Sequence, residues 1–206
     1  MDATLTDDRL DRFEAALRGD LLRPDDDGYG DARTVWNGMI DRRPAVIARC
    51  AGVADVLEAV TLARESGCPV SVRGGGHNVS GSAVCDDGLV IDCSEMTAVS
   101  VDPAARTAWV QAGARWIDVD HETQAFDLAT PGGVVSDTGV AGLTLGGGIG
   151  HLRRKHGLSC DNLRSVELVT AESEFVTASE TCHPDLFWAL RGGGGGFGVA
   201  TAFEFD

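Results

Sequence analysis

Four clusters of glycine constrain this chain more than any other feature of its sequence. The chain has 206 residues, of which 27 are glycine, and the glycines gather at 74–76, 132–133, 139–150 and 192–198. Glycine weakens the interior of a helix or strand, but it permits positive φ angles and lets other groups approach the backbone closely. We therefore expect these clusters in loops, where successive N–H groups can form an anion-binding nest suited to a pyrophosphate. The alternative, glycines that serve tight turns only, stays open at this point.

The segments between the clusters predict an α+β fold. A strand–helix–strand unit over residues 44–73 ends immediately before the first cluster, and a strand follows at 88–94. Further along, alternation and helical spacing predict hairpins at 98–114 and 161–179, helices at 115–126 and 182–191, and a final strand at 197–206. Before this region we expect a helix over 5–18 and a loop over 21–43. Helices mixed with hairpins are typical of α+β proteins rather than of regular doubly wound sheets.

The charge and the cysteines exclude several classes of protein. There are 32 acidic and 17 basic residues, a net charge of -15, which repels nucleic acid and anionic membrane. The N-terminus has no apolar run typical of a signal peptide, so we expect neither a membrane span nor secretion and place the chain in the cytoplasm. No CxxC pair occurs, and we expect six buried free thiols at Cys50, Cys68, Cys85, Cys93, Cys160 and Cys182.

Two nucleotide-binding motifs can be tested against their required context. Gly193, Gly195 and Gly198 match G-x-G-x-x-G, but this match follows a predicted helix and precedes a predicted strand. The dinucleotide fingerprint requires the opposite order, and no P-loop is present. The motif context therefore argues against a nicotinamide-dependent enzyme of the Rossmann type.

His77 is the strongest candidate among the five histidines. It stands at the end of the first glycine cluster, after a strand, where its ring can reach a ligand held by the loop. We expect His121, His156 and His183 to be structural or solvated, and His151 to lie at the surface although it follows a glycine tract. No metal-ligand spacing surrounds His77, which leaves acid–base chemistry, hydrogen bonding or covalent attachment.

Three segments together resemble a known family. They are VSVRGGGHNVSG at 70–81, the segment 129–171 around LTLGGGIG, and HPDLFWALRGGGGGFGVATAFEF at 183–205. They resemble the FAD-linked oxidases of the vanillyl-alcohol-oxidase and p-cresol-methylhydroxylase (PCMH) fold, in the branch of berberine-bridge-enzyme-like and 6-hydroxy-D-nicotine oxidases. The resemblance runs from about residue 39 to the end of the chain. It implies a PCMH-type FAD-binding domain of two α/β subdomains.

The resemblance also implies which residues meet the cofactor. His77 occupies the position of the histidine that is bonded to the 8α-methyl of the flavin, and metal is not implied. Val135 occupies the position of a cysteine that forms a second link in some relatives, so a single histidyl link is implied. The implied FAD-binding residues are Arg73, Gly74, Gly75, Gly76, His77, Asn78, Gly132, Gly133, Val134, Ser136, Gly139, Gly142, Gly146, Gly148, Gly150 and Val199.

The implied function is that of a flavin-dependent oxidase, which transfers a hydride from a small organic substrate to FAD and is reoxidised by dioxygen. We expect an N-terminal segment at 1–38 and the FAD-binding domain at 39–206. The family continues through a substrate-binding domain that is absent here, so we expect a C-terminally truncated fold. No catalytic base can be assigned, and the chain alone is expected to be inactive. The alternative is a non-catalytic, flavin-binding remnant of a split or truncated gene.

Overall fold

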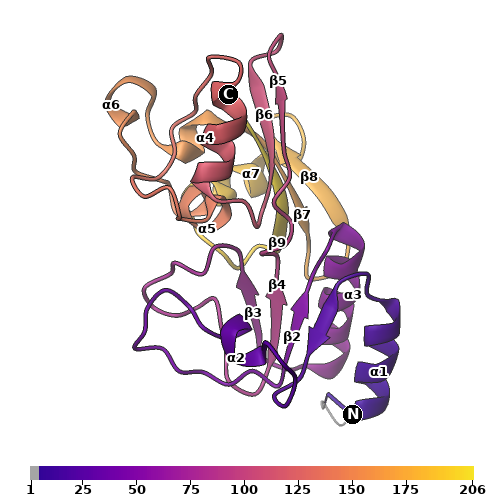
Figure 1. The fold of residues 1–206 in the computed structure, drawn as a ribbon. Coiled ribbons are helices and arrows are strands. Elements are labelled where there is room, and N and C mark those ends of the chain that lie inside the picture. Colours follow the sequence, from indigo (N-terminus) through magenta and orange to yellow (C-terminus); the bar gives the residue numbers. More distant parts are fainter. Residues whose placement is uncertain (1–4) are drawn as a thin grey trace.

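A computed structural model describes residues 5–206 as two lobes, each built on one β-sheet. Figure 1 shows the lobe with β1 to β4 below the lobe with β5 to β9, and the loops that follow β3 face the region of α5. Helix α3 (Val53–Ser66) contacts both β4 of the first sheet and β7 of the second. The two sheets therefore share one core.

The first sheet has the order β1-β2-β4-β3. Strand β1 (Asp20–Leu22) runs antiparallel to β2 (Val46–Arg49), whereas β4 (Leu89–Asp92) is parallel to β2 and to β3 (Val70–Arg73). The predicted strand–helix–strand unit is confirmed as β2, α3 and β3. Its two strands are not neighbours, because β4 lies between them.

Both faces of the first sheet are covered. Val46, Leu89 and Ile91 pack into the core shared with α3 and with α1 (Asp7–Ala16). Ile47 and Val90 point to the other face, into a smaller cluster under the N-terminal segment. Ile47 is fully buried, which stabilises the fold by about 1.5–3 kcal/mol relative to an exposed side chain. This two-sided burial explains why β2 and β4 are continuous apolar runs rather than alternating ones.

The second sheet is antiparallel throughout, with the order β5-β6-β9-β7-β8. The predicted hairpins are confirmed as β5 (Val99–Asp102) with β6 (Thr107–Gln111), and β7 (Leu163–Val169) with β8 (Phe175–Ser179). The last strand, β9 (Val199–Phe205), lies between β6 and β7. The α+β class and the two subdomains are thus as the sequence predicted.

Short helices connect the strands of the second sheet. The predicted helices are confirmed as α4 (Trp116–Gln124) and α7 (Pro184–Leu190), the latter with its proline at the first helical position. Between them lie α5 (Val140–Leu145), α6 (Arg153–His156) and a 3-10 helix (Ser159–Asn162).

Two expectations for individual segments are wrong. The predicted loop at 21–43 contains the end of β1 and also helix α2 (Tyr29–Ala32). A strand of three residues is defined by its pairing with β2, and it is too short for a periodic pattern. The glycine cluster at 139–150 is not loop throughout, because α5 occupies 140–145. The segment VAGLTL contains a single glycine, and its six residues form about 1.7 helical turns.

The cysteines agree only in part with the expectation. All six are free, and Cys50, Cys93 and Cys160 are buried. Burial raises the pKa of the Cys93 thiol to about 12. Cys68 and Cys85 are only partly buried and Cys182 is exposed, so the expectation of six buried thiols is wrong for these three. All three lie in segments that connect strands and helices, where neighbouring elements cover the chain less completely.

The N-terminal segment shares the core of the rest of the chain. Leu10 and Phe13 of α1 pack in the same cluster as Phe205, and β1 extends the first sheet. The boundary at residue 38 stays a prediction, and residues 1–4 of that segment lie outside the described residues. Within residues 5–206, no helix combines the length and apolar character needed to span a bilayer.

Candidate functional site

The first glycine loop begins where β3 ends. Arg73 is the last residue of the strand, and the chain then leaves the sheet through residues 74–78. Gly76 has a φ of 70°, in the left-handed region that glycine adopts without strain. Among the hydrogen bonds found within residues 5–206, none is donated by the backbone N–H groups of 74–78. Five successive free donors at the end of a parallel strand form a site for an anion.

The first loop touches the second glycine cluster backbone to backbone. A Cβ atom on Gly75 would lie 2.5 Å from both Cα and N of Gly139. On Gly74 it would lie 2.9 Å from the carbonyl oxygen of Ala112. Neither residue can carry a side chain without moving the backbone opposite. Because Gly75 and Gly139 both lack side chains, the two predicted cofactor-binding segments can lie in direct backbone contact.

Trp116 supports the remainder of the second cluster. Cβ atoms on Gly132 and Gly133 would lie 2.5 Å and 3.2 Å from its indole ring. A Cβ atom on Gly150 would lie 1.7 Å from the carbonyl oxygen of Gly132. Trp116 is fully buried, and its Nε1 has no hydrogen-bond partner among the described residues. The segment thus folds back on itself over one aromatic ring.

Other predicted residues of this cluster are open to solvent. Val134 and Val135 are each 56% exposed, and a Cβ atom on Gly142 would meet nothing within 4 Å. Ser136 accepts a hydrogen bond at its backbone carbonyl from Ile117. The exposed valines are apolar groups without protein contacts to cover them, as expected of residues that meet a ligand.

His77 is held by three residues from distant parts of the chain. Its Nε2 lies 3.2 Å from Oδ2 of Asp137, and Asp137 also accepts a hydrogen bond from the Arg115 guanidinium. Trp36 stacks on the imidazole with ring centroids 5.9 Å apart. The hydrogen bond from His77 and the charge of Arg115 hold the pKa of the Asp137 carboxyl below its ordinary value. Asp137 is therefore a carboxylate at neutral pH.

The Arg73 side chain lies beneath the first loop. Its guanidinium donates to the backbone carbonyl of Ala32, next to the end of α2. Its Nε is buried and has no partner within residues 5–206. A buried donor without an acceptor is uncommon in folded proteins and marks a place where a ligand can complete the bonding.

The third glycine cluster meets the second through backbone bonds. The N–H groups of Gly192 and Gly194 both donate to the carbonyl of Leu145 at the end of α5. The G-x-G-x-x-G match lies between helix α7 and strand β9. This confirms the prediction that it lacks the strand-then-helix context of a dinucleotide fingerprint. Val199 pairs with Val169 in the sheet and is only 6% exposed. Its predicted role stays a prediction that rests on the resemblance.

Three residues of this region escaped the sequence analysis. Trp36, Arg115 and Asp137 have no motif of their own, and all three lie far in sequence from His77. The segment 36–40 covers the first loop, since the Trp36 N–H donates to the carbonyl of Gly76 and Ile40 packs against Gly81. In the sequence, the indication of this contact is a tryptophan within a segment that has no periodicity. In the structure, Trp36 is 64% exposed.

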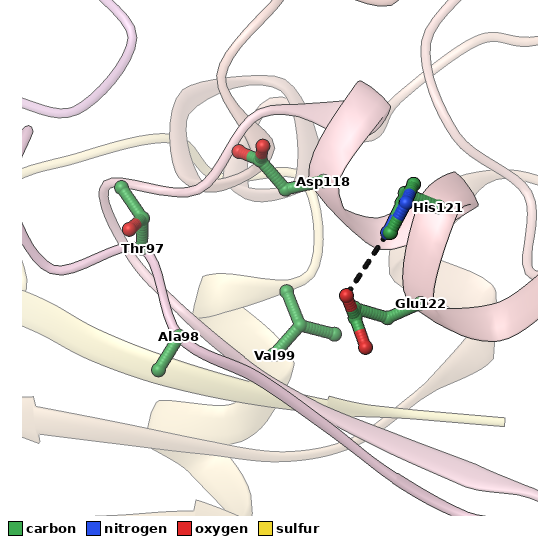
Figure 2. A pocket seen from close by; sticks show the side chains of 6 residues that line it. All are labelled: Thr97, Ala98, Val99, Asp118, His121 and Glu122. Carbon is green, nitrogen blue, oxygen red and sulfur yellow. Dashed lines mark hydrogen bonds and ion pairs between the residues drawn. The ribbon is translucent and has the colours of Figure 1, made fainter.

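The remaining histidines lie at the periphery of the molecule. His151 and His156 are exposed, and His183 precedes α7 with its ring beside the carbonyl of Thr177. Figure 2 shows His121 beside Glu122 on α4, in a surface pocket of about 390 Å³ that contains no predicted cofactor residue. Within residues 5–206, no group of three or more histidine, cysteine or acidic side chains could hold a metal ion.

Comparison with known proteins places this site in a family. The family described as FAD binding domain matches residues 44–179. The chain is 39% identical to (R)-6-hydroxynicotine oxidase of Paenarthrobacter nicotinovorans over 92% of its own length. The crystal structure of 6-hydroxy-D-nicotine oxidase from Arthrobacter nicotinovorans superimposes with a TM-score of 0.90 at 38% identity, covering 92% of this chain and 42% of that one.

A second solved structure is informative about the flavin. Glucooligosaccharide oxidase from Acremonium strictum, studied for its 6-S-cysteinyl, 8α-N1-histidyl FAD, superimposes with a TM-score of 0.88 at 34% identity, covering 96% of this chain and 42% of that one. The present chain spans 41% of the length of (R)-6-hydroxynicotine oxidase. With the glycine loops, the two sheets and these likenesses in agreement, the chain belongs to the FAD binding domain family, among relatives of the 6-hydroxy-D-nicotine oxidase type.

Proposed function

We propose that this chain is the FAD-binding module of a flavin-dependent oxidoreductase that oxidises a small organic substrate and uses dioxygen as the final acceptor. One observation carries the proposal above the others. The backbone N–H groups of residues 74–78 have no acceptor within the described chain, although they stand at the end of a parallel strand. Such a nest suits the diphosphate of a dinucleotide. The acidic surface makes a nucleic-acid phosphate an unsuitable occupant.

The described residues fit FAD. The loop offers backbone donors and no side chains that would obstruct a diphosphate, and Gly75 and Gly139 lie so close that only glycine is accommodated. Arg73 Nε lies beside Gly76 of this loop and is a buried donor without a partner within residues 5–206. The chemistry supplied by bound FAD would be acceptance of a hydride from a substrate C–H bond and return of the electrons to dioxygen.

His77 is the residue that would hold the cofactor covalently, through a bond from its ring to the 8α-methyl carbon of the flavin. Its Nε2 faces Asp137, and its Nδ1 makes no hydrogen bond within residues 5–206. The histidyl FAD of the related glucooligosaccharide oxidase supports this assignment. Val135 stands where a second, cysteinyl link would need a thiol, so one link is proposed.

Intact mass under denaturing conditions tests both the cofactor and its anchor. After incubation with FAD, we expect the wild-type chain to be yellow and heavier by one flavin, because denaturation cannot release a covalent adduct. His77→Ala should lose the added mass, since alanine has no nucleophilic nitrogen. His121→Ala is the matched control, because His121 is also paired with a carboxylate but lies on exposed α4.

The possible outcomes separate the alternatives. A yellow wild-type protein without added mass would contradict the covalent link and leave the FAD site intact. A colourless protein at the bare mass would contradict FAD binding and favour a remnant that has lost the cofactor. Added mass that survives His77→Ala would place the link on another residue.

A further inference from the structure

Asp137 connects His77 to Arg115 across two different segments of the chain. Its Oδ2 lies 3.2 Å from Nε2 of His77, and its Oδ1 accepts a hydrogen bond from the Arg115 guanidinium. The carboxylate is 58% exposed, whereas the His77 side chain is only 19% exposed. The pair joins the first glycine loop to the segment just before Gly139, where the two backbones touch.

We propose that Asp137 is a positioning residue for flavin attachment, which holds Nε2 of His77 so that Nδ1 is the nitrogen that forms the bond to carbon. The inference rests on the proposed function of His77. It assigns to Asp137 a role in the attachment, for which the resemblance implies His77 only.

The hydrogen-bonding chemistry of the pair selects the tautomer. A carboxylate has only acceptors, so Nε2 must carry the proton when it faces Asp137. In neutral imidazole the other nitrogen, Nδ1, then carries the lone pair. The free Nδ1 of His77 is thus the nucleophilic nitrogen, and without the carboxylate the ring would exchange freely between its two tautomers.

Asp137 also balances the charge that develops on the ring. Bond formation from Nδ1 to the 8α carbon makes the imidazole cationic until the Nε2 proton leaves, and a carboxylate beside that proton stabilises the cation. One C–H bond of the methyl group breaks and one N–C bond forms. Bound flavin would accept the two electrons and pass them to dioxygen, which would become hydrogen peroxide by taking up the methyl proton and the Nε2 proton.

Arg115 and Trp36 maintain this geometry. Arg115 is the residue before α4, where its backbone N–H donates to Asp118 and its guanidinium holds the second oxygen of Asp137. Trp36 stacks on the imidazole at an interplanar angle of 21°, which limits rotation of the ring away from the carboxylate. The groups that face Asp137 are therefore His77 and Arg115, both of which favour its ionised form.

Three variants of Asp137 separate orientation from charge. Asp137→Ala removes both, Asp137→Asn keeps an acceptor oxygen without the charge, and Asp137→Glu restores the charge on a longer side chain. Glu122→Gln is the matched control, because it removes the carboxylate of the exposed pair with His121 at 3.0 Å. Circular dichroism of each variant verifies folding before the measurements.

Two readouts are needed. Nitrogen-15 NMR of the flavin-free chain reports the tautomer of His77, which we expect to carry its proton on Nε2 in wild type and in Asp137→Asn, but to be mixed in Asp137→Ala. Denaturing mass spectrometry after addition of FAD reports the rate of attachment. We expect that rate to fall roughly 100-fold in Asp137→Ala and about 10-fold in Asp137→Asn, to recover in part in Asp137→Glu, and to be unchanged in Glu122→Gln.

Each result decides for or against the inference. A wild-type His77 that is protonated on Nδ1 overturns it, whether or not flavin is attached. Attachment in Asp137→Ala at the wild-type rate also overturns it, while leaving the proposed function of His77 intact. A wild-type chain that gains no flavin mass overturns the attachment itself, and the role of Asp137 in it falls with that result.

Discussion

The glycine loop after β3 and the glycine run after α7 have similar composition and different physical requirements. In the first, a Cβ atom on Gly75 would lie 2.5 Å from the backbone of Gly139. In the second, Cβ atoms on Gly194 and Gly195 would meet nothing within 4 Å. Gly194 has a φ of 79°, whereas Gly195 shows no left-handed φ. Gly75 of the first loop thus needs to be glycine for packing, whereas Gly194 of the second run needs to be glycine for backbone conformation alone.

Disrupting the backbone contact between Gly75 and Gly139 should destabilise the protein most. Gly75→Ala would force the first loop away from Gly139, and we expect the free energy of unfolding to fall by about 3 kcal/mol, as for other overpacked sites. Urea unfolding monitored by tryptophan fluorescence measures it. Gly195→Ala is the matched control, expected within about 0.5 kcal/mol of wild type because it meets no atom. Equal losses in the two variants would contradict the comparison.

A smaller loss of stability is expected at a position that needs glycine for its backbone conformation but not for packing. Gly194→Ala places a Cβ atom in open space but in a left-handed backbone, which costs about 1–2 kcal/mol for a residue other than glycine. The same urea titration, set beside Gly195→Ala, isolates this cost because the two positions are adjacent and equally open. A Gly194→Ala variant as stable as Gly195→Ala would show that the run relaxes to another conformation.

The smallest change in stability is expected from the charge of Asp137, which pairs with His77 of the first loop. The pKa of Asp137 is depressed in the folded state by its hydrogen bond to His77 and by Arg115. Its stabilising effect is therefore present above the ordinary carboxyl pKa of about 3.9 and is lost as the pH falls through the depressed value. Solvent screening of this exposed carboxylate limits the size of the effect.

Chemical unfolding of Asp137→Asn and wild type across this pH range measures that dependence. We expect the difference in their stability to be largest near neutral pH and to shrink as the pH falls below the ordinary carboxyl pKa of about 3.9, because the unfolded chain then takes up the proton on Asp137 more readily than the folded protein does. A difference that grows on acidification would contradict the sign of the pKa shift.

The order of elements could be predicted from the sequence because each leaves a local pattern. These patterns depend on residues that are close together in the sequence. They are the apolar run of β2, the helical spacing of α3, and the turns of the hairpins β5–β6 and β7–β8. The glycine cluster after β3 was equally readable, and its position after a strand made His77 a candidate. Strand β1 and helix α5 were not predicted, since one is very short and the other is interrupted by glycine.

Short, contiguous patterns are enough to predict the family, the element order and the position of His77. Three features appear only in the folded protein: β4 enters between β2 and β3, Gly75 contacts Gly139, and Asp137 and Trp36 contact His77. Asp137 and His77 are 60 residues apart. Contacts of this kind depend on how sheets and loops pack in three dimensions, so a periodic pattern in the sequence does not predict them.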